Sequence, residues 1–582
     1  MRLPLAAIFS LALSLSAPAA PPAAPAQPKL IIAILVDQLR YDYLERFHDQ
    51  FVEGGFKLLT DHGAFLTGAH YNYVPTTTAP GHASAFSGTT PASHGIIGND
   101  WFDKKTKKMI NCVSDPTATG VGVTGVGGKV SPRNFIGNNF ADELRLRFRT
   151  KVVGISMKDR GAVLPSGKKP AGAYWFESKS GNFVTSNYYM PALPEWVSAF
   201  NKRQRPASFL DQNWDRLLAA DAYERADNLP GESAFPGEPL PVFPHHIIRV
   251  TPEVEKKIAS SSKVLDPVTD LNAPLSPIIQ QPEVPHDTFD YFFPSPFANE
   301  VLAEFAQAAI EGEKLGQGQG SGPDLLTVSF SAIDACGHRF GPYSQEVQDI
   351  TLRLDRQLAE FFKYVDQKIG LANVAIVLTA DHGVMPPPDY AALEGMDGQR
   401  ANDVLLMGDL VSKLTAKFGS SNVLLARRIV DGQMYFNYDF LKEKNISVAD
   451  LSSFIRDWAF STGKFQACYT REQLLDGRAP GAIGQRVING FNAERSGDLV
   501  LVYKPFIIPW GVVNGTTHGS PYAYDTHVPV LLYGSLFKPG RYAEEVNMTD
   551  FVPTLCAALH MNEPAGCIGK PFVRALAEEE NK

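Results

Sequence analysis

Residues 374–383 read VAIVLTADHG, an apolar run that ends directly in an aspartate and a histidine. Residues 325–333 form a second apolar run, LLTVSFSAI, which is followed by Asp334 and then by His338. Near-continuous apolar runs are typical of central strands in a parallel sheet, which are buried on both faces. Ligands of open α/β sheets bind beyond the carboxyl ends of such strands. The two runs therefore predict a functional edge at which acidic and imidazole side chains meet.

Strands and helices alternate along the chain. Residues 29–36, 151–156 and 527–532 are further apolar runs that predict strands. Residues 344–369 repeat Val, Ile, Leu and Phe at a spacing of three to four, which predicts an amphipathic helix. This alternation predicts an α/β fold with a central, mostly parallel sheet flanked by helices.

The composition is that of an ordinary globular protein, with 44% hydrophobic and 20% charged residues. A formal net charge of −8 offers no electrostatic case for binding nucleic acid. We expect one domain over residues 29–582, with two insertions. The insertion at about 161–307 shows no clear period, and the insertion at about 395–510 is expected to be of mixed helix and strand.

The first twenty residues have the pattern of a cleavable signal peptide. Arg2 precedes a short apolar stretch, and Ala17-Pro18-Ala19 supplies small residues for cleavage. The alternative is a short membrane anchor, but the stretch falls below the ~20 residues needed to span a bilayer. Residues 21–28 are a leader rich in Pro and Ala. We expect a secreted or periplasmic protein with no membrane span.

Five cysteines are too few for a disulfide scaffold. Cys556 and Cys567 are close enough in sequence to pair in an oxidising compartment. Cys336 lies between Asp334 and His338, where a small buried filler is the simpler role than a soft metal ligand. The oligomeric state is left open.

The acidic and imidazole residues are numerous enough for two metal sites. A further aspartate, Asp37, follows the apolar run at residues 29–36, and a further histidine, His518, lies in a late loop. Oxygen and nitrogen donors suit zinc and related divalent ions, and catalytic zinc keeps three protein ligands and one open position. The alternative is that each aspartate caps a helix and each histidine packs. The candidate ligands are Asp37, Asp334, His338, Asp381, His382 and His518.

The run Thr76-Thr77-Thr78-Ala79-Pro80-Gly81-His82 predicts the start of a helix. Backbone N–H groups and the helix dipole attract an anion at such a place. A threonine hydroxyl there becomes a nucleophile when a metal stabilises its alkoxide. The alternative for Thr78 is a turn or a helix N-cap.

Five motifs together resemble those of the alkaline phosphatase superfamily, in the branch that holds nucleotide pyrophosphatase/phosphodiesterases and the threonine-type alkaline phosphatases. They are Thr78-Ala79-Pro80-Gly81-His82, Ser93-His94-Gly95-Ile96-Ile97-Gly98-Asn99, Asp334-x-x-x-His338, Asp381-His382-Gly383 and the loop around His518.

This resemblance implies two zinc ions and a division of labour among the candidate residues. It implies that Thr78 is the nucleophile, which also contacts a metal, and that Asn99 donates an amide N–H to a phosphoryl oxygen. It assigns one zinc to Asp37, Asp381 and His382, beside the nucleophile, and the other to Asp334, His338 and His518.

The strand at 151–156 leads into Lys158-Asp159-Arg160. In an extended chain, residues i and i+2 face the same way, so Lys158 and Arg160 could both point into the site. Two cations fit the dianion of a phosphate monoester better than the single charge of a diester. The pair resembles that of PafA-type and PhoK-type alkaline phosphatases. The alternative is an exposed basic turn.

We therefore expect an exported two-zinc alkaline phosphatase that hydrolyses small phosphate monoesters through a phosphothreonine intermediate. One alternative is a nucleotide pyrophosphatase or phosphodiesterase of the same superfamily. Another, from a different class, is a metal-binding export protein without turnover. Other polar residues receive simpler interpretations: Asp349 and Asp355 as solvated charges, His245 and His246 as surface residues, and His82 and His94 as braces of helix starts.

Overall fold

The computed structural model describes residues 27–261, 287–318, 320–509 and 514–577. The predicted signal peptide and most of the leader, residues 1–26, lie outside the described residues. Within the described ranges, no helix has the length and apolar character needed to cross a membrane.

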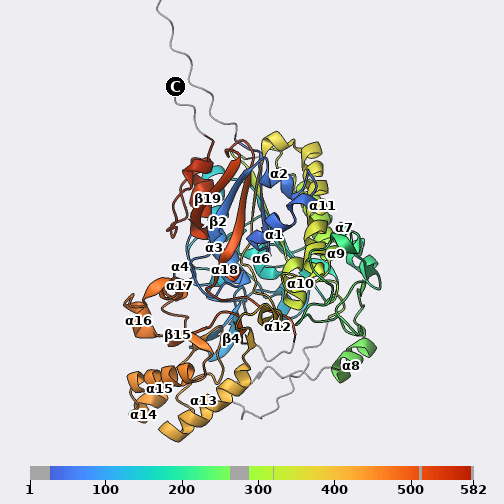
Figure 1. The fold of residues 1–582 in the computed structure, drawn as a ribbon. Helices are drawn as coiled ribbons and strands as arrows, with labels where there is room; N and C mark the ends of the chain where they lie inside the picture. Colours follow the sequence, from blue (N-terminus) through green and yellow to red (C-terminus); the bar gives the residue numbers. More distant parts are fainter. Residues whose placement is uncertain (1–26, 262–286, 319, 510–513, 578–582) are drawn as a thin grey trace, which may run out of the picture.

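A ten-stranded sheet forms the centre of the molecule (Figure 1). Its middle strands are parallel, because β1 pairs in parallel with both β11 and β12, and β11 pairs in parallel with β6. Antiparallel pairing is confined to the neighbours of β18 and β8. The predicted α/β class with a mostly parallel sheet is confirmed. In spatial order the strands are β19 (Gly540–Asn547), β2 (Ala64–His70), β18 (His527–Tyr533), β12 (Val374–Thr379), β1 (Leu30–Val36), β11 (Asp324–Phe330), β6 (Val152–Ser156), β7 (Gly172–Glu177), β8 (Asn182–Ser186) and β5 (Gly120–Val121).

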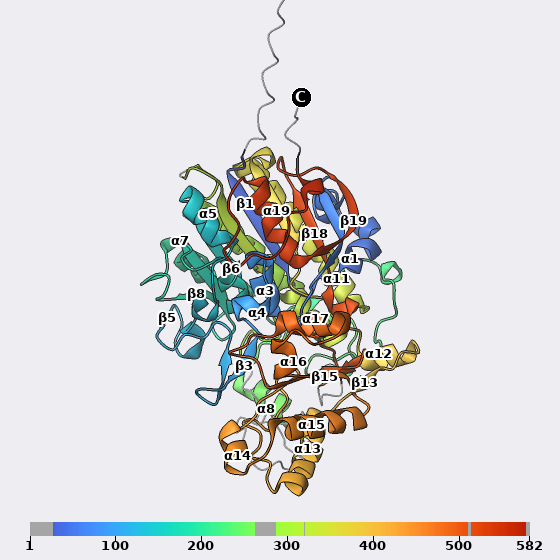
Figure 2. The same cartoon turned by 90° about the vertical axis from the view of Figure 1, so that its left-hand side faces the viewer.

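Two groups of helices pack along the sheet. The first group comprises α7 (Glu195–Lys202), α9 (Pro296–Glu313), α10 (Ala332–Phe340) and α11 (Gln345–Lys368). The second comprises α3 (Thr78–Ser87), α4 (Pro91–His94), α5 (Phe140–Phe148), α6 (Asp159–Val163) and α19 (Phe551–Ala558). Helices α7, α10 and α11 contact α9, and α4, α5, α6 and α19 contact α3. Helices α3 and α11 lie on opposite sides of the central strands (Figure 1), and α19 lies beside α3 (Figure 2). Both faces of the central strands are thereby buried, as their continuous apolar sequences require.

The strand before Asp334 is shorter than predicted. β11 ends at Phe330, and residues 332–340 form helix α10 instead of extending the strand to Ile333. Asp334 lies in the first turn of this helix and His338 one turn later, so the two side chains share one helix face. The apolar Ala332 and Ile333 are buried in the core from the helix, which is why they continue the apolar pattern without being strand residues.

Helix α11 confirms the predicted amphipathic helix, with Ser344 accepting a hydrogen bond from the Val347 N–H as N-cap. Its Asp349 and Asp355 are fully buried, so their interpretation as solvated charges is wrong. Asp349 accepts hydrogen bonds from the Trp214 indole at 2.7 Å and the Leu217 N–H at 2.6 Å. Such carboxylates satisfy backbone and indole donors of segments that pack over the helix.

His245 is also buried, which corrects its placement on the surface. Its imidazole lies between Glu238 and Glu346, at 3.0 Å from each. The carboxylates raise the pKa of His245 to about 9 against the opposing effect of burial. This histidine therefore fastens the segment around residues 213–246 to helix α11.

The two segments predicted as insertions contain ordered strands and helices. Within 161–307, residues 172–186 supply β7 and β8 to the main sheet. Residues 399–508 build a lobe with its own hydrophobic cores, at the end of the molecule away from β19 (Figure 2). This lobe contains β13 (Gln399–Arg400), α13 (Asp403–Phe418), β14 (Gln433–Met434), α14 (Tyr438–Glu443), α15 (Val448–Ser461), β15 (Phe465–Thr470), α16 (Arg471–Leu475), α17 (Gly481–Gly490), β16 (Leu499–Tyr503) and β17 (Ile507–Ile508).

Cys556 and Cys567 are both free thiols, so the disulfide considered for them is not formed in this structure.

The remaining elements connect the sheet, the helices and the lobe. The short elements are α1 (Tyr41–Arg46), α2 (Phe56–Thr60), β3 (Asp100–Asp103), β4 (Lys108–Asn111), β9 (Asn213–Trp214), β10 (His245–His246), α8 (Pro252–Ser261), α12 (Pro388–Leu393) and α18 (Ala523–Thr526).

The buried carboxylate of Asp355 predicts a measurable contribution to stability. It accepts hydrogen bonds from the N–H groups of Val52 and Phe56, both at 2.7 Å. Asp355→Ala leaves both donors without a partner, so we expect a loss of about 2–4 kcal/mol in urea unfolding. The control is Asp366→Ala on the same helix, where an exposed carboxylate accepts a hydrogen bond from the Leu371 N–H and from no other group of the described residues, and we expect a loss below about 1 kcal/mol. Equal losses in the two variants would contradict this account.

Candidate active site

The carboxyl ends of four neighbouring strands bring the candidate residues together. Asp37 follows β1, Asp381 follows β12 with one residue between, and Lys158 follows β6. Asp334 comes from the first turn of α10, just after β11. Because β12, β1, β11 and β6 are adjacent and parallel, their ends meet at one edge of the sheet.

The first group of ligands is Asp37, Asp381 and His382. Nε2 of His382 lies 3.4 Å from Oδ1 of Asp37 and 3.5 Å from Oδ2 of Asp381. All three side chains have no exposed surface. Donor atoms of these three residues all lie within 4.8 Å of one another, the arrangement that a single metal ion requires.

The same three atoms are buried polar atoms without a hydrogen-bond partner among the described residues. Leaving a buried oxygen or nitrogen unsatisfied costs about 1–3 kcal/mol, so three at one point demand a further partner. Ligands that lie about 2.0–2.1 Å from a tetrahedral zinc are themselves roughly 3.3 Å apart. The residues therefore fit a divalent ion.

The second group gathers around Oδ1 of Asp334. Nε2 of His338 lies 3.3 Å and Nε2 of His518 lies 3.6 Å from this oxygen. His382 links the two groups. Its ring stacks on that of His518 with 3.5 Å between centroids. Its donor atom also lies within 4.8 Å of the donor atoms of Asp334 and His518. The two groups are thus immediate neighbours.

The three histidines present the same nitrogen to the site. Nδ1 donates to a backbone carbonyl in each: to Thr516 from His338, to Gly383 from His382 and to Thr76 from His518. A carbonyl only accepts, so Nδ1 carries a proton in each ring, and the lone pair of a neutral ring is then on Nε2. Burial lowers the pKa of His338, but the charge of Asp334 outweighs it and raises that pKa. Burial lowers the pKa of His382 and that of His518, which keeps both rings neutral. Neutral imidazole is the form that binds a metal.

The carboxylates carry more negative charge than their neighbours offset. Burial raises the pKa of Asp37 well above its usual value, and the charges of Asp334 and Asp381 raise it further. Burial acts in the same direction on Asp334, but Lys158 and His338 hold the pKa of Asp334 well below its usual range. A cation at this edge would relieve the repulsion that Asp37 experiences.

Lys158 is shared between the two groups. Its Nζ donates to Oδ2 of Asp37 at 2.5 Å and to Oδ2 of Asp334 at 2.6 Å. Burial would lower the pKa of Lys158, but these two carboxylates raise it, so the side chain stays charged. An ammonium has three donors, and these bonds occupy two of them.

The predicted extended chain after β6 continues only to Lys158, which has an extended backbone and is the N-cap of α6. Arg160 lies in the first turn of that helix. Burial would lower the pKa of Arg160, but Asp159, Cys112, Asp37 and Asp334 raise it, and its buried Nε has no hydrogen-bond partner among the described residues. Lys158 therefore contacts the ligands directly, and Arg160 lies near enough for the charges of Asp37 and Asp334 to act on it.

Thr78 begins helix α3 beside the first group of ligands. Two hydrogen bonds fix this helix start: the Ala79 N–H donates to Oδ1 of Asn99 at 2.8 Å, and Nδ1 of His82 donates to the Thr78 carbonyl at 2.8 Å. Nδ1 of His82 also lies 3.2 Å from Oδ2 of Asp381. His82 thus braces the helix start, as predicted, and also contacts a candidate ligand.

Two residues that carry no sequence signal complete the surroundings of the ligands. Gln38 contacts both Asp381 and Asp334. Asp525 accepts a hydrogen bond from the Ser520 N–H, close to His518, and its carbonyl accepts one from the Gly383 N–H. Their proximity to ligand motifs in the sequence is the only hint of these contacts.

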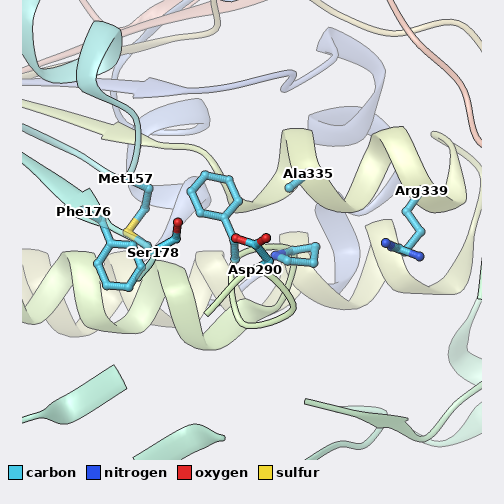
Figure 3. A pocket seen from close by; sticks show the side chains of 8 residues that line it. Met157, Phe176, Ser178, Asp290, Ala335 and Arg339 are labelled. Atoms are coloured by element: carbon cyan, nitrogen blue, oxygen red, sulfur yellow. The ribbon is translucent and has the colours of Figure 1, made fainter. Parts of the chain in front are cut away.

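Two cavities lie near candidate residues, and the second of them is lined by one. A hollow of about 360 Å³ lies beside the helix that carries Asp334 and His338, with Ala335 and Arg339 on its wall (Figure 3). A second cavity, of about 110 Å³, is lined by Thr77 and His518 together with apolar residues of the 399–508 lobe. The lobe therefore reaches the immediate surroundings of the ligands.

Gly81 allows helix α3 to pack directly against the candidate ligand Asp381. A Cβ atom at this position would lie 2.3 Å from the carbonyl oxygen of Asp381 and 2.6 Å from its Cβ. We expect Gly81→Ala to displace the helix from Asp381. The variant should then bind less zinc, measured by elemental analysis, and should have lower activity. The control is Gly408→Ala in α13, where an added Cβ atom would meet no heavy atom within 4 Å beyond its own helix backbone and chain neighbours. For this variant we expect the zinc content of the wild type, and a stability that is equal or higher by up to about 1 kcal/mol. Full zinc content in Gly81→Ala would refute the close packing.

The chain is similar over almost its whole length to known bacterial proteins. It is 34% identical over 556 residues to alkaline phosphatase PafA of Elizabethkingia meningoseptica, covering 94% of this chain and 95% of that protein. It is 35% identical over 559 residues to alkaline phosphatase PhoV of Synechococcus elongatus, covering 95% and 93%. The crystal structure of wild-type PafA superposes with a TM-score of 0.84, at 34% identity, over 95% of this chain and 100% of the other.

The family model for type I phosphodiesterase / nucleotide pyrophosphatase matches residues 31–509, which include all the candidate residues except His518. The chain belongs to this family, within the alkaline phosphatase superfamily.

Proposed function

We propose that this protein is a phosphomonoesterase that works through a covalent phosphothreonine at Thr78. The observation that carries the proposal is the cluster of three unpartnered donor atoms beside helix α3, on Asp37, Asp381 and His382. The relatives named alkaline phosphatase, matched over nearly the full chain, support the same reaction class.

Two divalent ions complete the proposed site, and zinc suits the donors. Asp37, Asp381 and His382 would hold one ion and Asp334, His338 and His518 the other, and the ions would stabilise negative charge on the oxygens that enter and leave phosphorus. The remaining work falls to side chains of this chain.

Thr78 supplies the nucleophilic oxygen. Its hydroxyl proton passes to solvent, and Oγ1 forms a bond to phosphorus while the bond from phosphorus to the ester oxygen breaks. The alcohol leaves with a proton taken from solvent. Water then forms a bond to phosphorus, the bond between Oγ1 and phosphorus breaks, Oγ1 regains a proton and phosphate is released. The hydrogen bonds of Asn99 and His82 to the first turn of α3 fix the position of Thr78, which serves the in-line geometry of the transfer.

Three polar side chains would hold the non-bridging oxygens. Asn99 uses its carbonyl oxygen on Ala79, which leaves the amide N–H groups as donors. Lys158 has one ammonium N–H beyond its bonds to Asp37 and Asp334. Arg160 has a buried Nε without a partner among the described residues. Two cations beside one phosphoryl group favour the dianion of a monoester.

A diesterase of the same family is the second candidate, and the description of the matching family model favours it. A diesterase needs fewer cations around the phosphoryl group than a monoesterase, since a diester has one negative charge.

A protein that binds metal without turnover is the third candidate. We also infer export, on the signal-like residues 1–20, and a single phosphatase domain over 29–582 that includes the insertions.

Kinetic constants of five proteins separate these candidates. With zinc supplied, we expect the wild type to hydrolyse an aryl phosphate monoester with a higher kcat/KM than the matching methyl diester. Thr78→Ala should lose at least about 10³-fold in monoester kcat/KM, because the nucleophile is absent. Lys158→Ala and Arg160→Ala should each lose about 10²–10³-fold on the monoester and less on the diester.

The matched control is Lys169→Ala, an exposed lysine near the same strand, which should keep both rates. A faster diester reaction in the wild type, unchanged by Lys158→Ala, would establish the diesterase instead. Stoichiometric zinc without phosphate release would establish the non-catalytic protein.

A further inference from the structure

Gln38 has an unusual backbone for its place in the fold. It follows Asp37 directly at the end of β1, has no exposed surface, and adopts a φ of +67°. A residue other than glycine in this region costs about 1–3 kcal/mol and persists where its surroundings hold it. The contacts of Gln38 must therefore hold its backbone in this conformation.

Gln38 makes one hydrogen bond to each group of ligands. Its backbone N–H donates to Oδ1 of Asp381 at 3.1 Å, and its side-chain Nε2 donates to Oδ1 of Asp334 at 2.7 Å. Asp381 belongs to the first group and Asp334 to the second. Each bond orients a carboxylate whose other oxygen has a different neighbour, His82 for Asp381 and Lys158 for Asp334.

The amide suits this position because it is neutral. A lysine or arginine there would compete with a metal for the carboxylate, whereas an amide donor fixes the orientation and leaves the negative charge in place. The same oxygen of Asp334 faces Nε2 of His338 and of His518. Gln38 therefore holds the oxygen around which the second group is arranged.

Helix α10 makes room for this side chain at Gly337. A Cβ atom at residue 337 would lie 1.8 Å from Oε1 of Gln38. Glycine inside a helix is less favourable than alanine by about 1 kcal/mol, so its presence between Asp334 and His338 needs a reason. The approach of the Gln38 amide supplies that reason.

We propose that Gln38 is a positioning residue that couples the two metal groups and sets their spacing, with Gly337 as the opening that admits its side chain. The proposal rests on the two-metal function proposed above. It extends that function to a residue that touches neither the substrate nor the metals.

Zinc titration of the metal-free protein by calorimetry tests the proposal. Gln38→Gly removes the amide, keeps the backbone N–H and relieves the positive φ, so the fold should be retained. We expect about 10–100-fold weaker zinc binding and a changed absorption spectrum of the cobalt-substituted protein, because an outer partner of a ligand is lost. Gln204→Gly is the matched control. Gln204 also has a positive φ, of 49°, but it is exposed and its side chain donates to Asn182 and not to a candidate ligand, so this variant should bind zinc as the wild type does.

A second substitution separates positioning from general damage. Gly337→Ala should weaken zinc binding in the wild type, where the new methyl group meets the amide, and should have no further effect in Gln38→Gly, where the amide is absent. Wild-type affinity in Gln38→Gly, or equal losses from Gly337→Ala in both backgrounds, would overturn the proposal. Failure of the proposed function is distinct, because it would appear in the unsubstituted protein. A failed two-metal site would show fewer than two bound zinc ions, and a failed reaction assignment would show in the monoester and diester rates.

Discussion

Three buried aspartates at one edge of a sheet are the constraint on which the rest of the site depends. Asp37, Asp334 and Asp381 have at most 4% of their surface exposed, and Lys158 is the one lysine that forms ion pairs with two of them among the described residues. Uncompensated buried carboxylates are costly, so a cation bound among them would stabilise the fold. The unpartnered donor atoms and the raised pKa of Asp37 both accompany this concentration of buried negative charge.

The parallel sheet meets the condition by geometry. β1 lies between β11 and β12 and pairs in parallel with both, so Asp37 emerges between the residues that follow its neighbours. Helix α3 is pressed against Asp381 at Gly81, and α10 approaches Gln38 at Gly337. Two glycines thus allow two helix segments, one with Thr78 and one with two ligands, to converge on the same edge.

The sequence predicts the strands and most ligands because both signals are local. Continuous apolar runs identify β1, β11 and β12, and the acidic and imidazole residues follow those runs directly. Where a contact is made between distant segments, local patterns fail. The apolar Ala332 and Ile333 continue a strand pattern but pack from a helix, Asp349 is buried because an insertion covers it, and Lys158 reaches the site as a helix cap. The role of Gln38 depends on a backbone conformation that no residue pattern encodes.

Anomalous X-ray diffraction at the zinc edge from crystals of the zinc-loaded protein tests the central claim most directly. We expect two peaks, one bounded by Asp37, Asp381 and His382 and the other by Asp334, His338 and His518. Their separation should be about 4 Å, the spacing typical of two-metal sites. A single peak, or two peaks of which one lies away from these residues, would contradict the account.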